Sequence, residues 1–117
     1  MKLQDYWDLS RQEAVRLKLK YHITQPCEIS IGVGWIPVVE AALDKIYALG
    51  RPVHLRCVKQ KFCQLRIYVN VVDVGFDAII ESAKHACDNF CEACGKEREY
   101  KGFRLGLAIC EACNLLL

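Results

Sequence analysis

Two Cys-x-x-Cys pairs near the C-terminus constrain the fold of this chain more than any other feature of the sequence. Cys91 pairs with Cys94 and Cys110 with Cys113, with 15 residues between the pairs. A two-residue spacer lets one tight turn direct two sulfur atoms at one ion, and this separation is typical of four-cysteine zinc sites. The sequence therefore predicts that these four cysteines bind a structural Zn²⁺.

The residues around the pairs predict the form of the site. Gly95 follows the first pair and Asn114 the second, and both residue types tolerate the positive φ that a zinc knuckle needs. Both pairs read Cys-Glu-Ala-Cys, which predicts two equivalent knuckles. The glycine, aromatic and leucine residues within 96–109 favour a β-hairpin, so residues 91–117 are expected to form a zinc ribbon. Because so short a segment buries little apolar surface, the metal would supply much of its stability.

Other uses of these cysteines are disfavoured. Two disulfides need an oxidising compartment, whereas the N-terminal sequence Met-Lys-Leu-Gln-Asp-Tyr-Trp-Asp is not that of a signal peptide, so we expect a reducing cytoplasm. A thioredoxin-like motif has a single Cys-x-x-Cys pair. Cys87 or His85 could replace a ligand, although both fall on a predicted helix, where a buried cysteine and a solvated histidine are favoured. A site with four cysteine ligands is closed to substrate, which argues against zinc catalysis.

Length and composition predict one compact domain with the ribbon packed on it. The chain has 117 residues, of which 53% are hydrophobic and 26% charged, enough for an α+β domain over residues 1–90. No apolar run approaches the roughly 18 residues of a membrane span, so no membrane partner is expected. The formal net charge of +2 falls to about zero once Zn²⁺ and four thiolates are counted, so nucleic-acid binding would need a local basic patch. Four further cysteines are expected in the core: Cys27, Cys57, Cys63 and Cys87.

Three helices are predicted from their end signals. A capping box at Ser10-Arg-Gln-Glu13 predicts a first helix over 11–20, preceded by a turn or short helix that docks on the core. Pro37 and Gly50 mark the ends of a second helix over 37–49. Asp73 is expected to cap a third helix over 74–89, whose apolar residues recur at i, i+3, i+4 and i+7.

A glycine pair precedes the second helix. Gly32 and Gly34 suggest a phosphate-binding loop, but no Lys-Ser/Thr follows them and the Gly-x-Gly-x-x-Gly pattern is incomplete. The pair is therefore predicted to form a turn that leads into the helix. A short strand is expected just before it, over 27–31.

Residues 53–71 alternate between apolar and polar types and predict an antiparallel β-hairpin with its bend at 59–62. Leu55 and Cys57 are expected on the core face, with His54, Arg56 and Val58 on the outer face. Basic groups interleaved with an aromatic ring can bind a protein, or can hold phosphates and stack a base. With one residue of the ribbon, these groups form the predicted partner surface: Arg56, Lys59, Lys61, Arg66, Tyr68 and Arg104.

One combination of motifs resembles a known family. The motifs are Gly34-Trp35, Val58-Lys-Gln-Lys-Phe62, Leu65-Arg-Ile-Tyr-Val69 and Cys91-x-x-Cys94-Gly95. Together they are similar to a family of small proteins encoded in phages and prophages, over about residues 30–95. At the bend this chain has Gln60 where the family pattern has glutamate, and Cys63 where it has glycine. The resemblance implies a phage accessory protein in a bacterial cytoplasm that blocks a host defence system or redirects a host enzyme.

These patterns bear on three classes of function. A protein that binds a host or phage protein is favoured, and a nucleic-acid-binding module is the alternative. An enzyme is not expected, because His54 and the cysteines Cys57 and Cys63 are predicted to point to opposite faces of the hairpin. The apolar tail Leu115–Leu117 is expected to pack on the domain or on a partner subunit, so a dimer is conceivable.

Overall fold

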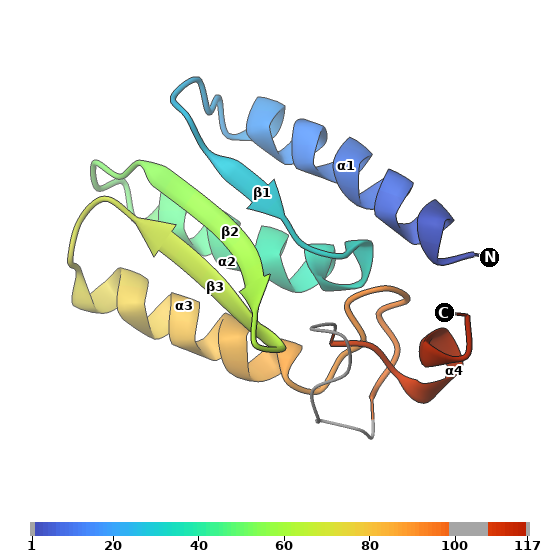
Figure 1. Ribbon diagram of the computed structural model, residues 1–117. Helices are drawn as coiled ribbons and strands as arrows, with labels where there is room; N and C mark the ends of the chain where they lie inside the picture. The colour runs from blue at the N-terminus through green and yellow to red at the C-terminus, as the bar shows by residue number, and fades with distance from the viewer. Residues whose placement is uncertain (1, 99–107, 117) are drawn as a thin grey trace.

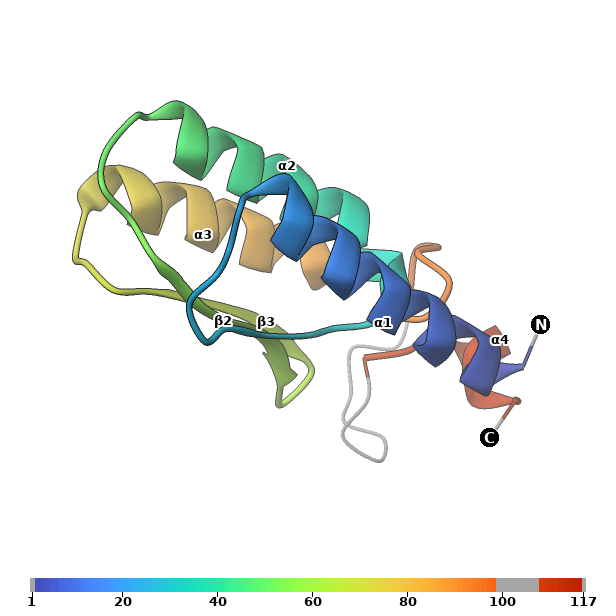
Figure 2. The ribbon, with the colours of Figure 1, turned by 90° about the horizontal axis from the view of Figure 1, so that it is seen from above.

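A computed structural model describes residues 2–98 and 108–116, and it has helices on one side of a three-stranded sheet (Figures 1 and 2). The elements in chain order are α1 (Leu3–Lys20), β1 (Glu28–Ser30), the 3₁₀ turn η1 (Val33–Trp35), α2 (Ile36–Ala48), β2 (Leu55–Lys61), β3 (Gln64–Val69), α3 (Val74–Cys87) and α4 (Glu111–Asn114). This arrangement confirms the predicted α+β class. In Figure 2, α1, α2 and α3 all lie on the same side of the strands, so the opposite side carries no helix among the described residues.

The sheet is mixed rather than a simple hairpin. Its strand order is β1-β2-β3, and β1 lies parallel to β2 with Glu28 opposite Cys57. Strand β3 lies antiparallel to β2, as the hairpin prediction requires. A parallel neighbour needs a crossover connection, and α2 supplies it between β1 and β2. The sequence indicated the short first strand but not this parallel pairing.

A register shift between Leu55 and Cys57 reverses part of the predicted alternation. Leu55 pairs with Val69 on the core face, whereas Cys57 pairs with Tyr68 on the outer face. Val58 then turns inward and is completely buried. A bulge inserts one extra residue and shifts every later side chain to the other face. The predictions that Cys57 faces the core and Val58 faces outward are therefore wrong.

The hairpin bend is shorter than predicted. Strand β2 continues to Lys61, which pairs with Gln64, so Lys59 lies in the strand and not in the bend. Phe62 and Cys63 form the turn, with φ values of 53° and 62°. Two successive positive φ values are typical of the type I′ turn, whose twist matches that of the flanking strands. Phe62 and Cys63 thus occupy positions where glycine or asparagine is usual.

Helix α1 begins eight residues before the predicted first helix, at Leu3. The Asp5 carboxylate accepts a hydrogen bond of 2.8 Å from the Lys2 N–H at the start of the helix. Ser10 lies within the helix, and its hydroxyl donates to the Tyr6 carbonyl at 2.8 Å. The capping-box prediction at Ser10 is wrong because this hydroxyl bonds to the preceding turn instead of capping a helix end.

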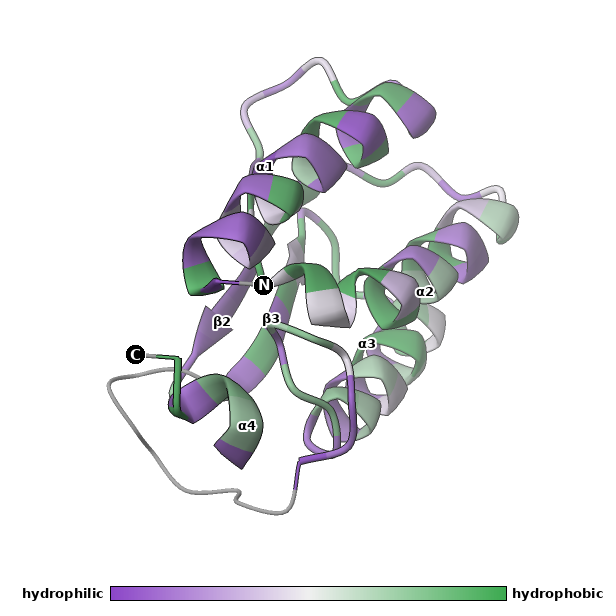
Figure 3. Ribbon diagram, turned by 90° about the vertical axis from the view of Figure 1, so that its right-hand side faces the viewer, coloured by the Kyte–Doolittle hydropathy of each residue, from purple (hydrophilic) through white to green (hydrophobic). Residues whose placement is uncertain are grey.

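Helix α1 is held to α2 by ion pairs. Arg16 and Lys20 each lie 2.7 Å from a carboxylate oxygen of Glu40. Side-chain hydrogen bonds from Arg16 and Lys20 lower the pKa of Glu40 to about 2. The contact is partly exposed, so each pair stabilises the helix packing only modestly. Figure 3 shows the difference between the two helices: α1 is mainly hydrophilic and buries only Leu17, whereas α2 is mainly hydrophobic.

Two apolar clusters fill the interior of the described residues. The main core lies between the sheet and the helices, and its largest fully buried side chains are Trp35 and Phe76. Asp73 caps α3 as predicted, accepting from the N–H of Gly75 at 2.7 Å and of Phe76 at 3.2 Å. The second cluster surrounds the C-terminal cysteines. Of the other cysteines, Cys63 and Cys87 are buried, while Cys27 is only partly so.

Among residues 2–98 and 108–116, no helix has both the length and the apolar character that crossing a membrane requires. The two ends of the described chain lie near one another, beside α4 (Figure 1). The N-terminal helix therefore lies close to the C-terminal cysteine pairs.

Trp35 links the start of α2 to the residue before the first cysteine pair. Its side chain is completely buried, and its Nε1–H donates to the Phe90 carbonyl at 2.8 Å. Trp35→Phe should lower the free energy of unfolding by about 2–3 kcal/mol, because it leaves a cavity and an unpaired carbonyl. Urea unfolding of the metal-loaded protein measures this loss. Trp7→Phe, at a half-buried position on α1, is the matched control, and equal losses in the two variants would contradict the role given to Trp35.

Candidate metal centre

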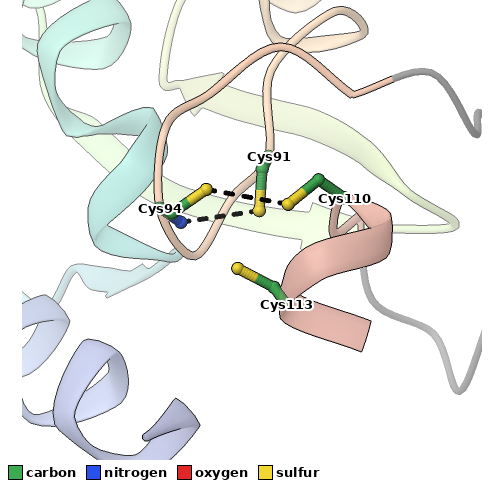
Figure 4. A group of neighbouring side chains, drawn as sticks. All are labelled: Cys91, Cys94, Cys110 and Cys113. Carbon is green, nitrogen blue, oxygen red and sulfur yellow. Dashed lines mark hydrogen bonds between the residues drawn. The ribbon is translucent and has the colours of Figure 1, made fainter. Parts of the chain in front are cut away.

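The four cysteines of the two pairs come together in one cluster (Figure 4). Their sulfur atoms all lie within 4.8 Å of one another, and the Cys94 and Cys110 sulfurs are 3.7 Å apart. A tetrahedral Zn²⁺ site with bonds of about 2.3 Å has sulfur atoms about 3.8 Å apart. Three of the cysteines are buried and Cys94 is partly so. The donor set and its spacing therefore fit a metal ion with four sulfur ligands.

The first pair forms the predicted knuckle. Gly95 has a φ of 78°, and its N–H donates to the Cys91 carbonyl at 2.9 Å. The N–H of Cys94 lies 3.4 Å from the Cys91 sulfur, and the N–H of Lys96 lies 3.5 Å from the Cys94 sulfur. Amide donors aimed at sulfur favour the thiolate, which is the form that binds a metal.

The second pair is built differently. Cys113 lies in the short helix α4, which Cys110 precedes, and the Asn114 N–H donates to the Cys110 carbonyl at 2.9 Å. Asn114 is helical and does not have the positive φ predicted for it. Glu92 of the first pair is 3% exposed, whereas Glu111 of the second is exposed to solvent. The prediction of two equivalent knuckles is therefore wrong, because the second segment is helical and buries its two cysteines but not its glutamate.

Burial of the cluster affects its acidity. Burial raises the pKa of the Cys94 and Cys113 thiols. For Cys110, burial acts in the same direction, but hydrogen bonds from the Cys113 backbone and the neighbouring thiols outweigh it and lower the pKa. Binding to a cation would favour the thiolate form of each ligand, since coordination deprotonates a thiol outright.

Glu92 connects the first knuckle to the rest of the protein. One of its carboxylate oxygens accepts from the Ala108 N–H at 2.9 Å and from the Gln60 side chain at 3.2 Å. Its backbone N–H donates to the Ala108 carbonyl at 2.8 Å, and its own carbonyl accepts from the Gly34 N–H at 2.8 Å. The residue thus ties together the knuckle, the segment before the second pair, strand β2 and the glycine turn. No sequence signal distinguished it from Glu111.

The glycine pair is a contact surface for the knuckle. A Cβ atom on Gly34 would lie 2.2 Å from the Cys91 carbonyl oxygen, and one on Gly32 would lie 1.9 Å from the Glu92 carbonyl oxygen. Only glycine permits so close an approach between two backbones. The prediction of a turn leading into α2 holds, but the close approach could not be predicted because its partner lies some 60 residues later in the sequence.

The N-terminal turns of α1 also contact the cluster. Leu3, Tyr6 and Trp7 are partly buried and pack against the cysteines. These side chains recur at i, i+3 and i+4, so they share one face of the helix. The N-terminal residues thus dock on the cysteine cluster, whereas Leu17 of the same helix joins the main core.

The alternative ligands lie elsewhere. Cys87 is buried in the main core on α3, and His85 is exposed, with its Nε2 3.2 Å from a Glu81 carboxylate oxygen. Among the described residues, the group that could hold a metal consists of the four paired cysteines alone. The predicted ribbon hairpin over 96–109 falls mostly on 99–107, which lie outside the described residues.

Four of the predicted partner residues share one side of the sheet: Lys59, Lys61, Arg66 and Tyr68. The pairing places Cys57 opposite Tyr68, Lys59 opposite Arg66 and Lys61 opposite Gln64, all on the face away from the helices. The Lys59 amine lies 6.0 Å from the centre of the Tyr68 ring. Arg56 is exposed at the register shift, and Arg104 lies outside the described residues.

The apolar tail does not pack on the domain as one alternative predicted. Leu115 is 78% exposed and Leu116 is 47% exposed, while Leu117 lies outside the described residues. Packing on a partner subunit stays a prediction.

Comparison with known proteins gives no relative. No protein-family model matches the chain, and neither a curated protein nor a solved structure matches it at a significant level. The resemblance to phage-encoded proteins stays a prediction. The function is therefore argued from the geometry of this chain.

Proposed function

We propose that this is a non-catalytic protein, stabilised by Zn²⁺, that binds a host or phage protein through the outer face of its sheet. The observation that carries the proposal is the face itself: basic and aromatic side chains lie together on strands β2 and β3, on the side that carries no helix among the described residues. The resemblance to phage accessory proteins adds the nature of the partner. A reducing bacterial cytoplasm suits a chain whose cysteines are all free thiols or metal ligands.

The metal centre supports a structural role for the ion. Four sulfur ligands complete a tetrahedral site and leave no position for a substrate. The centre lies where α1, the glycine turn and the two cysteine pairs meet. Its contribution is to hold these segments together, and hence to fix the sheet that α1 and α2 support.

Cys57 supports the same conclusion. It lies on the outer face, where a nucleophile would be accessible, with its sulfur 4.0 Å from a Glu28 carboxylate oxygen. Burial and the Glu28 charge raise the pKa of the Cys57 thiol. A reactive cysteine needs the opposite environment, one that stabilises the thiolate. The position of this cysteine on the outer face therefore does not make it a catalytic group.

The composition of the outer face suits a partner with acidic and apolar groups. Lys59, Lys61 and Arg66 contribute positive charge, and Phe62 is 63% exposed at the end of the hairpin. Exposed aromatic and arginine side chains are enriched among the residues that dominate binding energy at protein interfaces. The basic groups would raise the rate of association with an acidic surface.

A nucleic-acid partner is the second candidate. Lys59 lies over the Tyr68 ring, and the Lys61 amine lies 5.5 Å from the centre of the Phe62 ring. A ring beside a cation can stack a base while the cation contacts a phosphate. Binding of this kind weakens steeply with added salt, and a nuclease that digests the nucleic acid abolishes it.

Changing Arg66 to Glu and Tyr68 to Ala in one variant should weaken capture of the partner at least about tenfold, because both side chains lie on the proposed surface. The test is a pull-down from infected bacteria with the tagged full chain, with and without nuclease. Lys45→Glu, on the exposed side of α2, is the control and should keep full binding.

Comparing the pull-downs with and without nuclease distinguishes a protein partner from a nucleic-acid partner. A protein recovered after nuclease treatment, and lost in the double variant, supports the proposal. Loss of every partner on nuclease treatment favours the nucleic-acid candidate. Equal recovery by the double variant and by the unaltered chain would contradict the surface.

A further inference from the structure

Strand β3 forms one edge of the sheet, and among residues 2–98 and 108–116 no strand pairs with its outer side. Its sequence, Gln-Leu-Arg-Ile-Tyr-Val, lacks the proline that often protects an edge, and the bulge of the hairpin lies in β2. The other edge strand, β1, has three residues, and so short an edge offers little to pair with. Strand β3 is therefore the edge at which a further strand can add.

The backbone groups of β3 alternate between the two sides of the strand. Lys61 and Gln64 flank the two-residue turn and pair with each other, so the backbone groups of Gln64 point to β2. The Asn70 N–H donates to the His54 carbonyl at 3.0 Å and thus points the same way. The residues of β3 whose N–H and C=O groups point away from β2 are Leu65, Ile67 and Val69. Their N–H groups, the edge amides, form no hydrogen bond with another segment among the described residues.

The two faces of an added strand would have different surroundings. The side chains of Leu65 and Ile67 point to the core and are 1% and 5% exposed, and α3 packs against β3 on this side (Figure 2). Ile80 of α3 is only partly buried, so an apolar side chain beside Ile67 would extend the core. On the outer face the neighbours are Arg66 and Tyr68. An added strand must therefore alternate apolar with polar side chains, the apolar ones on the side of α3.

The charges of the outer face select the polar residues of such a strand. Lys59 lies opposite Arg66, and no carboxylate among the described residues forms an ion pair with either of them or with Lys61. Acidic side chains on the added strand would lie beside Arg66, where opposite charges on neighbouring strands attract. A second copy of β3 is disfavoured, because it would bring a further arginine and no carboxylate to the same edge.

We propose that β3 pairs with an antiparallel strand of the partner protein, in which aliphatic residues alternate with Asp or Glu. The edge amides and the carbonyls of the same residues bond to the backbone of that strand. Its aliphatic side chains lie over α3, and its carboxylates lie beside Arg66. In this mode of recognition backbone bonds give affinity and alternate side chains give specificity. The inference rests on the proposed function, because it describes how the same part of the sheet holds its partner.

Hydrogen exchange at single amides tests the edge. The probe is the peptide acetyl-Glu-Val-Glu-Val-Glu-Val-Glu-amide, added at millimolar concentration to the full ¹⁵N-labelled chain with its metal. In the free chain the edge amides should exchange faster than the amides of Arg66 and Tyr68, which bond to β2. The peptide should slow exchange at the edge amides at least about tenfold and leave Arg66 and Tyr68 unchanged. Edge amides that are protected already in the free chain, or unprotected with the peptide, would overturn the inference.

Two control peptides distinguish strand pairing from attraction between charges. The same peptide with N-methyl groups on its valines keeps its charges but lacks the N–H groups that bond to β3, so it should protect no edge amide. The peptide with lysine in place of each glutamate keeps its backbone and should bind at least about tenfold more weakly. Equal protection by the N-methylated peptide would contradict strand pairing, and equal binding of the lysine peptide would contradict the acidic pattern.

A variant of the edge extends the test to the partner itself. Val69→Pro removes one edge amide and should lower capture of the partner in the pull-down at least about fivefold. Val72→Pro, at a 96% exposed position beyond the strand, is the control. If Val69→Pro captures the partner fully and the double variant of Arg66 and Tyr68 does not, the outer face binds the partner without strand pairing. If both variants capture it fully, the outer face is not the binding surface, and the proposed function fails with the inference.

Discussion

Replacing Cys113 with serine is expected to abolish metal binding and to release the C-terminal segment from the protein. Cys113 is 3% exposed and is one of four sulfur atoms within 4.8 Å of one another. Structural zinc contributes about 10–16 kcal/mol of apparent binding energy in small zinc domains, and losing one ligand forfeits much of it. The free energy of unfolding should fall by at least about 3 kcal/mol, because the metal centre also holds the start of α1. Native mass spectrometry and urea unfolding measure the two effects.

Cys57→Ser is the matched control for this change. Cys57 is only partly buried and lies outside the cluster, so its replacement should leave the metal content and the stability near those of the unaltered chain. A Cys113→Ser variant that retains its metal and unfolds at the same urea concentration as Cys57→Ser would show that the cluster does not hold a structural ion.

Gly34→Ala is expected to be nearly as damaging, although it adds a single methyl group. The new Cβ would lie 2.2 Å from the Cys91 carbonyl oxygen and 2.4 Å from the Gly95 nitrogen. Both atoms belong to the backbone of the knuckle, so the knuckle must move away from η1 as a unit. We expect the free energy of unfolding to fall by about 3 kcal/mol or more, because overpacking against backbone cannot relax through a side-chain movement. The affinity for the metal should fall as well. Thermal unfolding with and without a chelator measures both.

Gly75→Ala is the matched control, because it adds the same methyl group at a position where the nearest atoms belong to side chains that can move. A Cβ on Gly75 would approach the ends of two side chains, those of Arg51 at 2.9 Å and Asp73 at 3.1 Å. Alanine also has the higher helix propensity, so the net effect in α3 should be small. If Gly34→Ala proved as mild as Gly75→Ala, the glycine turn would not be the surface on which the knuckle rests.

The parts of the fold that sequence predicted are those set by local signals. Asp73, followed by apolar residues at helical spacing, predicted where α3 begins. The observed cap confirms this prediction. The spacing of the cysteine pairs predicted that their sulfur atoms meet, and they do. In both cases the residues that decide the structure are close in sequence or belong to a motif with a fixed geometry.

The predictions that failed depended on distant partners. Helix α1 extends to Leu3 because its first turns have the cysteine cluster to pack against, about 90 residues later. The bulge at Cys57 arises in the pairing with β3 and leaves no sign in the alternation of β2 itself. Glu92 and Glu111 have the same neighbours in sequence, and only the position of the first knuckle against Gly34 and Ala108 buries one of them.

X-ray absorption at the zinc edge, on the full chain purified without chelator, tests the central claim most directly. That claim is a closed metal centre made of both cysteine pairs. The expected result is Zn²⁺ surrounded by four sulfur atoms at about 2.3 Å. Fewer sulfur atoms, with oxygen or nitrogen completing the coordination, would contradict the closed site. A catalytic role for the metal would then have to be considered.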